Sequence, residues 1–412
     1  MPTNPSSIDV LTDSPAIRQA GRSLLSLALM DARNCTLQLL ARFEEAVGAG
    51  LSIPRVDHFD PPERVAGHIA WLAEWWLGRN PQRGLGFRSP ADGPRLPSLH
   101  RQADSWFRHV GAEHWPELGE VRGYMLVQLE STLEILERAE ETDDGLYLFR
   151  AMLHYEDFIA EQLVAQARAL GLSLPVGSAA EYAAAEPLNL PATRWLLGAP
   201  ANGFALAIER PQWQVNILPF EIDAQPVNWS QFVEFVDDGG YDRSDWWHPQ
   251  GWEWLRQASI PDGRRGPRHV EQIRAAAGGV VINWSGRSVR VSGSQPVTHI
   301  TWWEADAWAR WAGRRLPLEM EWEVAVHQRQ GRSMRWGDVL EWTSTRLRPW
   351  DGYERDNWAV GTALDPQPHW EMARVLRGGS ISTRGRMKHK RSRRFALPDR
   401  DEAFTGFRTC AL

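Results

Sequence analysis

The sequence predicts an α+β protein of two domains: a four-helix bundle, followed by a domain of short strands and ordered loops. Three observations support this prediction. The chain has 412 residues, more than most single domains contain. Apolar residues recur at helical spacings over residues 14–175. Over residues 203–412 the alternating runs are short, and Gly, Pro and Trp are frequent.

Four segments of the first domain have the pattern of amphipathic helices. Pro61 and Pro62 open the second segment, where proline is tolerated in the first helical turn. Gly171 follows the fourth and is a favoured residue just beyond a helix end. Helices of this length favour an up-and-down bundle. The expected helices cover residues 16–49, 61–76, 118–139 and 146–170.

The remaining segments are expected to be less regular. Residues 176–202 are rich in Ala and Pro and are expected to link the two domains. In the second domain we expect helices near 229–236 and 303–311, with short strands and long loops elsewhere.

Composition limits the classes of function. The net charge of −6 argues against a general nucleic-acid or membrane-surface binder. No apolar run reaches the roughly 20 residues that a membrane helix needs. No basic stretch followed by an apolar one marks a signal peptide at the N-terminus. Cys35 and Cys410 give no disulfide framework, so we expect a cytoplasmic protein with reduced thiols.

Five short motifs lie in order near the C-terminal end of the chain. They are PVTHITW at 296–302, WAGRRLPLEMEWE at 311–323, EWT at 341–343, VLRGGS at 375–380 and GFRTC at 406–410. One such piece would be weak evidence, but five in this order are specific. Together they resemble the C-type-lectin-like fold of the formylglycine-generating-enzyme/sulfatase-modifying superfamily. A fold hosts many functions, so this resemblance implies architecture before activity.

The helical half carries a second resemblance. Residues 67–76, GHIAWLAEWW, and 143–161, DDGLYLFRAMLHYEDFIAE, look like the two metal-ligand helices of a DinB-like bundle. A DinB-like bundle fused to a sulfatase-modifying-type domain resembles the ergothioneine-biosynthesis sulfoxide synthases and the selenoneine synthases, over about residues 15–412. The resemblance implies a non-haem Fe(II) enzyme that uses dioxygen. Its implied substrates are hercynine, a trimethylated histidine, and a thiol or selenosugar donor, joined through a C–S or C–Se bond.

The sequence departs from this family at the implied metal site. The family's fourth helix carries His-x-x-x-His-x-Glu, which places two imidazoles on one helix face. Without a gap, those two positions fall on Tyr155 and Ile159, and Glu161 keeps its place. His154 lies one residue early, which turns it by about 100° around the helix. In neither register does this helix supply two histidines, so the candidate metal ligands are His68, His154 and Tyr155.

Three interpretations of the altered motif stay open. The iron site is rebuilt from His68 with Tyr155 or His154 and a further ligand. Alternatively, the metal is lost and the bundle has only a packing role. In the third interpretation, the protein keeps the cleft and binds a small molecule without redox chemistry.

The candidate substrate residues lie in a basic run at residues 384–395. Arg391, Arg393 and Arg394 are candidates for binding a carboxylate, because arginine makes bidentate contacts to such groups. The alternative is a solvated face paired with acidic residues of 399–402. The family often has Arg-Asn-Phe where this chain has Arg-Arg-Phe, which leaves the donor substrate open.

Tyrosines form a separate set of candidates, because family members place an active-site tyrosine near the iron. Tyr155 and Tyr353 are the candidate catalytic residues here. A trimethylammonium group also favours an aromatic cage, for which the 23 tryptophans offer many possibilities. The cysteine-pair chemistry of some sulfatase-modifying enzymes is not expected, because Cys35 and Cys410 fall in different domains.

The sequence thus predicts oxidative C–Se or C–S bond formation on hercynine. The alternative is a metal-free homologue that acts as a small-molecule or protein binding module.

Overall fold

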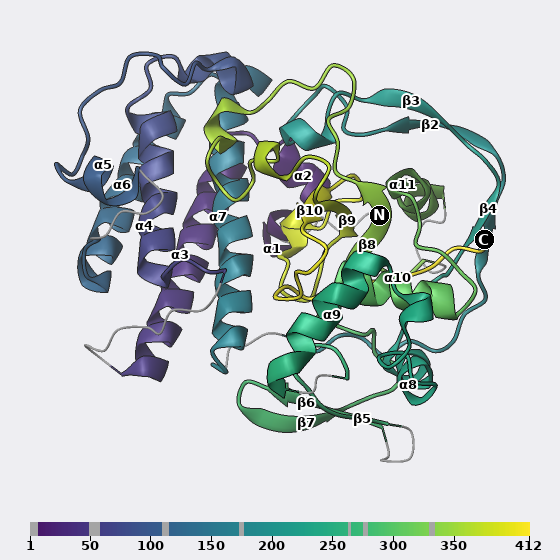
Figure 1. Cartoon of the computed structure of the whole chain (residues 1–412). Helices are drawn as coiled ribbons and strands as arrows, with labels where there is room; N and C mark the ends of the chain where they lie inside the picture. Colours follow the sequence, from purple (N-terminus) through teal and green to yellow (C-terminus); the bar gives the residue numbers. More distant parts are fainter. Residues whose placement is uncertain are drawn as a thin grey trace.

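The computed structural model describes residues 7–48, 58–108, 115–172, 177–262, 265–274, 279–328 and 334–412. Within these ranges an N-terminal helical region is followed by a mixed region of strands and helices (Figure 1). The predicted α+β class is therefore confirmed.

The helical region contains the four expected long helices. α3 and α4 each pack mainly against α6 and α7, and α3 also touches α4. This pattern is that of a four-helix bundle. Their bounds are α3 Arg22–Val47, α4 Pro62–Ala73, α6 Leu118–Glu137 and α7 Asp143–Ala169.

Two helix boundaries differ from the prediction for local reasons. The expected helix over 16–49 is interrupted, with a short α2 at Ser14–Arg18 before α3, and residue 49 lies outside the described part of the chain. The backbone N–H of Arg22 donates to Glu141 Oε1 at 3.1 Å, so one of the free N–H groups in the first turn of α3 has a partner from another part of the chain. α7 begins before residue 146 because the Thr142 side chain accepts from the Gly145 N–H at 3.0 Å.

α4 does not end at Ala73 but widens into a π-helical turn, Glu74–Gly78. The buried Glu74 carboxylate accepts the Leu99 N–H at 2.6 Å and is bonded by the Tyr124 hydroxyl. π-turns inside α-helices occur frequently at functional sites. This turn carries Trp75 and Trp76, and the short helix α5, Ala103–Phe107, packs against α4.

The mixed region is built on a four-stranded sheet with strand order β10-β9-β8-β11. β10 and β8 both run antiparallel to β9, and β11 runs parallel to β8. A three-stranded antiparallel sheet has the order β5-β6-β7. The bounds are β8 Leu340–Arg346, β9 Arg374–Gly378, β10 Arg393–Ala396, β11 Thr405–Phe407, β5 Val270–Arg274, β6 Gly279–Trp284 and β7 Arg287–Val291.

Four helices accompany these sheets in the described ranges of the second domain. α8 and α10 cover the segments where helices were expected, so those two predictions are confirmed. Asn228 and Thr301 cap their N-termini by accepting backbone N–H groups. The helices are α8 Trp229–Asp237, α9 Pro249–Asp262, α10 Trp302–Trp311 and α11 Glu319–Gln328.

The segment 176–202, expected as a linker, contains two strands. β1, Leu188–Leu190, pairs with β4, Phe220–Ile222, and β2, Thr193–Leu197, pairs with β3, Trp213–Ile217. Leu190 and Leu197 are buried in a core cluster with Trp322, so this segment packs as part of the mixed region. Ala and Pro content alone did not indicate these strands, because their partners come later in the chain.

Carboxylates on α7 hold the second domain against the bundle. Glu161 accepts from Arg394 Nη1 and from Thr383 Oγ1, each at 2.8 Å. Asp157 pairs with Arg386 through Nε–Oδ2 at 2.5 Å and Nη2–Oδ1 at 2.7 Å. All five side chains are buried. Loss of one partner would leave an uncompensated buried charge, so these pairs fix the β10 region against α7.

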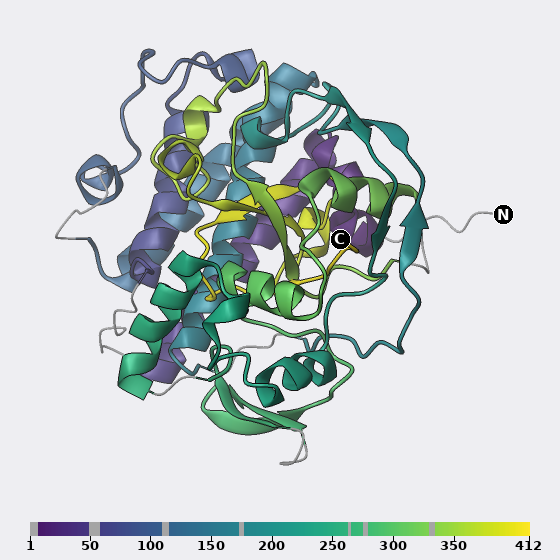
Figure 2. The same ribbon diagram turned by 45° about the vertical axis from the view of Figure 1, so that its right-hand side comes forward.

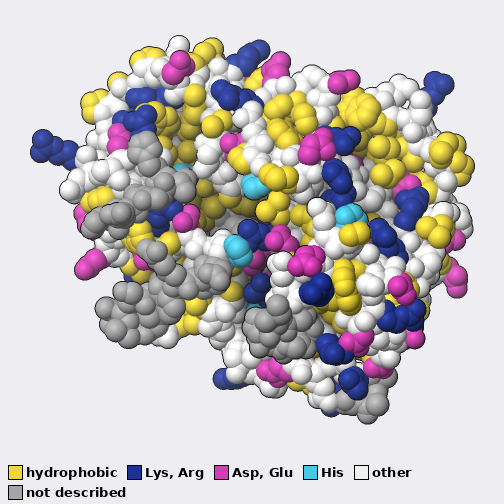
Figure 3. All heavy atoms as spheres, viewed as in Figure 1, with side chains coloured by type: hydrophobic (Ala, Val, Ile, Leu, Met, Phe, Trp, Pro, Cys, Tyr) yellow, Lys and Arg dark blue, Asp and Glu magenta, His cyan; other side chains and the backbone are white. Residues whose placement is uncertain are grey.

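Two views agree on this arrangement, with the C-terminal strands, drawn in yellow, lying between the bundle and the rest of the mixed domain (Figures 1 and 2). On the face shown in Figure 3, acidic and basic side chains are interspersed and form no single charged patch. None of the described helices is both long and apolar enough to cross a membrane.

Candidate functional site

Two adjoining cavities lie where α7 meets the second domain. The first, which we call the His68 cavity, has a volume of about 170 Å³. The second, the Arg394 cavity, has a volume of about 290 Å³ and is lined by α7 on one side and β10 on the other. The two share the lining residues His58, Phe59, Gln162 and Ala363. They therefore form neighbouring compartments of one interdomain cleft.

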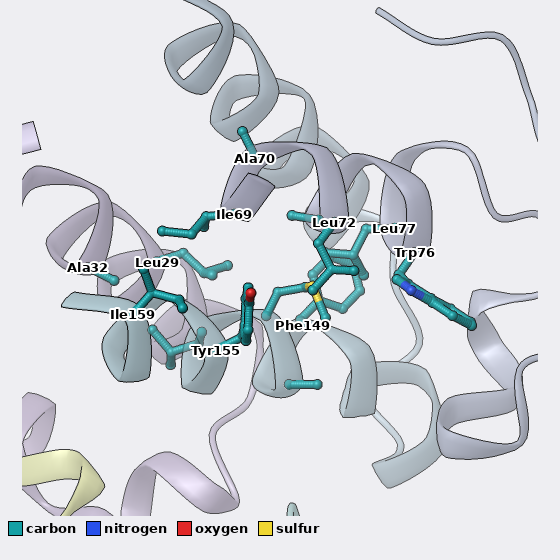
Figure 4. Close-up of a cluster of buried hydrophobic side chains, with 14 of the residues drawn as sticks. Leu29, Ala32, Ile69, Ala70, Leu72, Trp76, Leu77, Phe149, Tyr155 and Ile159 are labelled. Atoms are coloured by element: carbon teal, nitrogen blue, oxygen red, sulfur yellow. The ribbon is translucent and has the colours of Figure 1, made fainter. Parts of the chain in front are cut away.

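The structure brings His68, Tyr155 and Ile159 to the wall of the His68 cavity. Tyr155 and Ile159 lie four residues apart on α7, so they face the same side of the helix. Figure 4 shows both among the buried apolar side chains between α7, α3 and α4. The two positions of the ungapped register therefore share the His68 cavity, whereas those of the shifted register, His154 and Phe158, both line the Arg394 cavity.

Tyr155 and His68 form a hydrogen-bonded pair. The Tyr155 hydroxyl lies 3.0 Å from His68 Nδ1, and burial raises the pKa of this phenol. Burial also lowers the pKa of His68 to about 4, so the imidazole is neutral near pH 7. A buried phenol O–H needs an acceptor, and Nδ1 is the partner that the geometry provides. His68 therefore carries its proton on Nε2.

The iron implied by the sequence resemblance does not fit the side chains that meet here. Ile159 has no ligand atom, and the Tyr155 hydroxyl and His68 Nδ1 are hydrogen-bonded to each other at 3.0 Å. Among the described residues, no three His, Cys, Asp or Glu side chains are grouped so that they could hold a metal ion. A non-haem iron site needs such a set of ligands together with open positions.

The structure does not bring His154 to this pair. Its ring packs 5.3 Å from the Phe204 ring, and its side chain lines the Arg394 cavity instead. Burial lowers the pKa of His154 to about 3, so it too is neutral near pH 7. The reason is helical geometry, because adjacent residues on α7 point in directions about 100° apart.

The three candidate arginines have different surroundings. Arg393 is buried and donates to both oxygens of Glu319, at 2.8 and 3.1 Å. Arg391 donates to backbone carbonyls, including that of Leu196 at 2.8 Å. Arg393 and Arg394 both line the Arg394 cavity. Arg394 donates a hydrogen bond from Nη1 to Glu161, whereas its Nη2 has no hydrogen-bond partner among the described residues.

Tyr353 lies apart from both cavities. Its ring meets Trp370 edge to face, with centroids 5.4 Å apart, and burial raises the pKa of its phenol to about 12. Tyr155 and Tyr353 therefore do not share a site in the structure, and Tyr155 alone of the two lines a described cavity.

Several residues that line the two cavities were not among the candidates predicted from the sequence. Gln162 and Gln166 follow Tyr155 and Ile159 on the same face of α7 and line the His68 cavity. Their spacing was a signal that could have identified them. The lining of the Arg394 cavity also includes Glu402, His369 and Phe395, and the rings of the last two have centroids 5.3 Å apart. Nothing in the local sequence connects these last residues with α7.

Comparison with known proteins gives related chains for both regions. Residues 178–337 match the family described as the sulfatase-modifying factor enzyme 1-like domain. The hercynine oxygenase of Mycolicibacterium smegmatis is 30% identical over 413 aligned residues, which cover 83% of this chain and 88% of that protein. The hercynine oxygenase of Mycolicibacterium thermoresistibile is 28% identical, covering 94% of each chain. A formylglycine-generating enzyme of Streptomyces coelicolor is 33% identical but covers 35% of this chain and 46% of that enzyme.

Proposed function

The chain belongs to the hercynine oxygenase family, and on that premise we propose that it binds a hercynine-like betaine in the interdomain cleft without an iron centre. A betaine of this kind has a carboxylate and a fixed positive charge. The proposal therefore requires a cleft that recognises both charges. It also requires that the family's metal-ligand positions on α7 hold residues that bind no metal, here Tyr155 and Ile159.

The observation that carries the proposal is the Nη2 group of Arg394. Arg394 is buried and lines the cavity, and its Nη2, itself buried, has no hydrogen-bond partner among the described residues while Nη1 is paired with Glu161, so a ligand reaches Nη2 once the side chain turns toward the cavity. A buried donor without an acceptor costs free energy, and a ligand carboxylate would satisfy it. Glu402, His369 and Phe395 also line this cavity, and their carboxylate and aromatic groups suit a trimethylammonium group. A volume of about 290 Å³ suits a small ligand.

A second candidate function is oxidative C–S or C–Se bond formation on hercynine, with a thiol or selenosugar as donor. Similarity to the M. smegmatis hercynine oxygenase over 88% of that protein supports it. It requires Fe(II) and at least one ligand beyond His68 and Tyr155. The selenosugar form rests on sequence resemblance alone and is the narrower of the two donor hypotheses.

Binding of the betaine is tested by calorimetry with hercynine and with histidine, which lacks the trimethylammonium group. We expect hercynine to bind more tightly. Arg394→Lys keeps a cation beside Glu161 but loses the second donor nitrogen. A charge-assisted hydrogen bond contributes about 1.5–3 kcal/mol, so affinity should fall about ten- to a hundred-fold.

The matched control is Arg391→Lys, because Arg391 is bonded to backbone carbonyls and does not line the cavity. Its affinity for hercynine should equal that of the parent. No binding of hercynine, or equal affinity for histidine, would reject the betaine proposal.

Metal content separates the two candidate functions. Protein isolated without added iron should contain background iron, and anaerobic addition of Fe(II) should give no heat of binding. Stoichiometric iron in the parent that disappears in His68→Ala would instead support the oxidative enzyme.

A further inference from the structure

A continuous series of aromatic rings runs from the His68 cavity to the surface of the bundle. The ring centroids of Tyr155 and His68 are 5.9 Å apart, those of His68 and Trp71 5.6 Å, and those of Trp71 and Trp75 5.5 Å. Tyr155 and Trp71 are buried, whereas Trp75 is partly exposed. The imidazole of His68 lies between the phenol and the first indole.

The inner end of this series has the chemistry of a proton-coupled redox pair. A phenol is hard to oxidise while it keeps its proton, because the cation radical that forms is strongly acidic. Here the hydroxyl lies 3.0 Å from the Nδ1 nitrogen of His68, within the range for direct proton transfer. The α7 wall of the cavity holding this pair includes the apolar Ile159 and Leu163 beside the amides of Gln162 and Gln166.

We infer that Tyr155 and His68 form a redox-active pair that exchanges electrons with the surface through Trp71 and Trp75. In the forward step, a one-electron oxidant at the surface takes an electron from Trp75. An electron from Trp71 then reduces the oxidised Trp75, and an electron from Tyr155 reduces the oxidised Trp71 across the His68 ring. The Tyr155 proton moves to His68 Nδ1. The net products are a neutral tyrosyl radical, an imidazolium and the reduced oxidant.

Charged side chains lie beside both indoles of this path. The Trp71 Nε1–H donates to the Asp104 carboxylate at 2.8 Å, and Arg79 pairs with both oxygens of the same carboxylate, at 2.6 and 3.1 Å. The guanidinium groups of Arg79 and Arg108 lie 4.7 and 4.8 Å from the centre of the Trp75 ring and disfavour positive charge there. The Arg95 guanidinium also lies over the Trp75 ring, so the cations disfavour an oxidising equivalent that stays on Trp75.

The same arginines indicate the class of oxidant. Arg108 is exposed at this surface, and the Arg95 guanidinium lies 5.1 Å from the Trp75 ring. Opposite charge raises the local concentration of a small anion near such a group. The matching oxidant is a small anionic one-electron acceptor. This function does not depend on betaine binding, since its residues belong to α4, its π-turn and one face of α7.

A local photo-oxidant tests the path directly. Arg108→Cys in a Cys35→Ala background provides a site for a thiol-linked ruthenium polypyridyl complex beside Trp75, and Cys410 is buried. Flash oxidation of the bound complex should produce a tyrosyl radical, observed by transient absorption and electron paramagnetic resonance. Tyr155→Phe and Trp71→Phe should each abolish this signal. His68→Gln, which has no basic nitrogen, should abolish it too.

The matched controls are Trp76→Phe, next to Trp75 but outside the ring series, and Tyr353→Phe, at a distant tyrosine. Both should keep the full radical signal. No tyrosyl radical in the labelled parent, or an undiminished signal in Tyr155→Phe, would overturn the redox pair. An undiminished signal in Trp71→Phe would overturn the path. Circular dichroism of each variant distinguishes loss of the path from loss of the fold.

Discussion

Placing two histidines on α7 is the most direct check of the hypothesis that Tyr155 and Ile159 stand at the family's metal-ligand positions. The change is Tyr155→His together with Ile159→His. Both positions line the His68 cavity and lie one turn apart, so two imidazoles would join His68 around one point. Removing the phenol also releases the Nδ1 lone pair of His68, which now accepts the Tyr155 hydroxyl at 3.0 Å.

The expected energies come from the packing of these side chains. Ile159 is 4% exposed, and loss of such a side chain costs about 2–5 kcal/mol of unfolding free energy. Loss of the Tyr155 hydrogen bond costs about a further 0.5–1.5 kcal/mol. A bound metal at a concentration of 100 times its dissociation constant raises the unfolding free energy by about 2.7 kcal/mol. The metal-free double variant should therefore be less stable than the parent, and metal should recover a large part of the difference.

Thermal unfolding and calorimetry with Co(II), or with Fe(II) under anaerobic conditions, measure these effects. The midpoint of the double variant should rise on addition of metal, while that of the parent should not change. Each single variant is the control and should bind more weakly than the double variant. If the double variant gains no metal affinity over the parent, positions 155 and 159 are not the altered ligand positions.

Two further predictions concern stability. Glu156→Ala leaves the buried Arg33 guanidinium without its bidentate partner, now at 2.8 and 3.1 Å, and should lower the unfolding free energy by about 3–5 kcal/mol in urea titrations. Glu45→Ala, at an exposed ion pair, should change it by less than about 1 kcal/mol, and equal effects would contradict the burial argument. Burial holds the pKa of His299 well below its ordinary value, and Arg168 donates to its Nε2 at 2.8 Å. In the unfolded chain, His299 takes up a proton as the pH falls below about 6.5, whereas folded His299 does not. The contribution of His299 to the unfolding free energy is therefore full above that pH and is lost as the pH falls below it. His299→Gln should flatten the decline in stability between pH 7 and pH 5, and an unchanged slope would show that other groups control it.

The sequence determined the features that depend on local spacing. The four bundle helices and the α+β class follow from apolar periodicity and from the change in texture after residue 203. That Tyr155 and Ile159 share one face of α7 also follows from the helical repeat, whereas their meeting with His68 depends on the packing of α7 against α4. The same repeat turns His154 toward the other cavity.

Only the tertiary structure decided which charged groups remain available in the cleft. Arg393 and Arg394 are adjacent in the sequence, yet Arg393 is held by Glu319, 74 positions away, and Arg394 by Glu161, 233 positions away. A guanidinium can bind a ligand only with donors that the fold has not already used, and its partners come from distant parts of the chain. The strands of residues 176–202 were missed for the same reason, because a strand is stabilised by a partner that its own sequence does not specify.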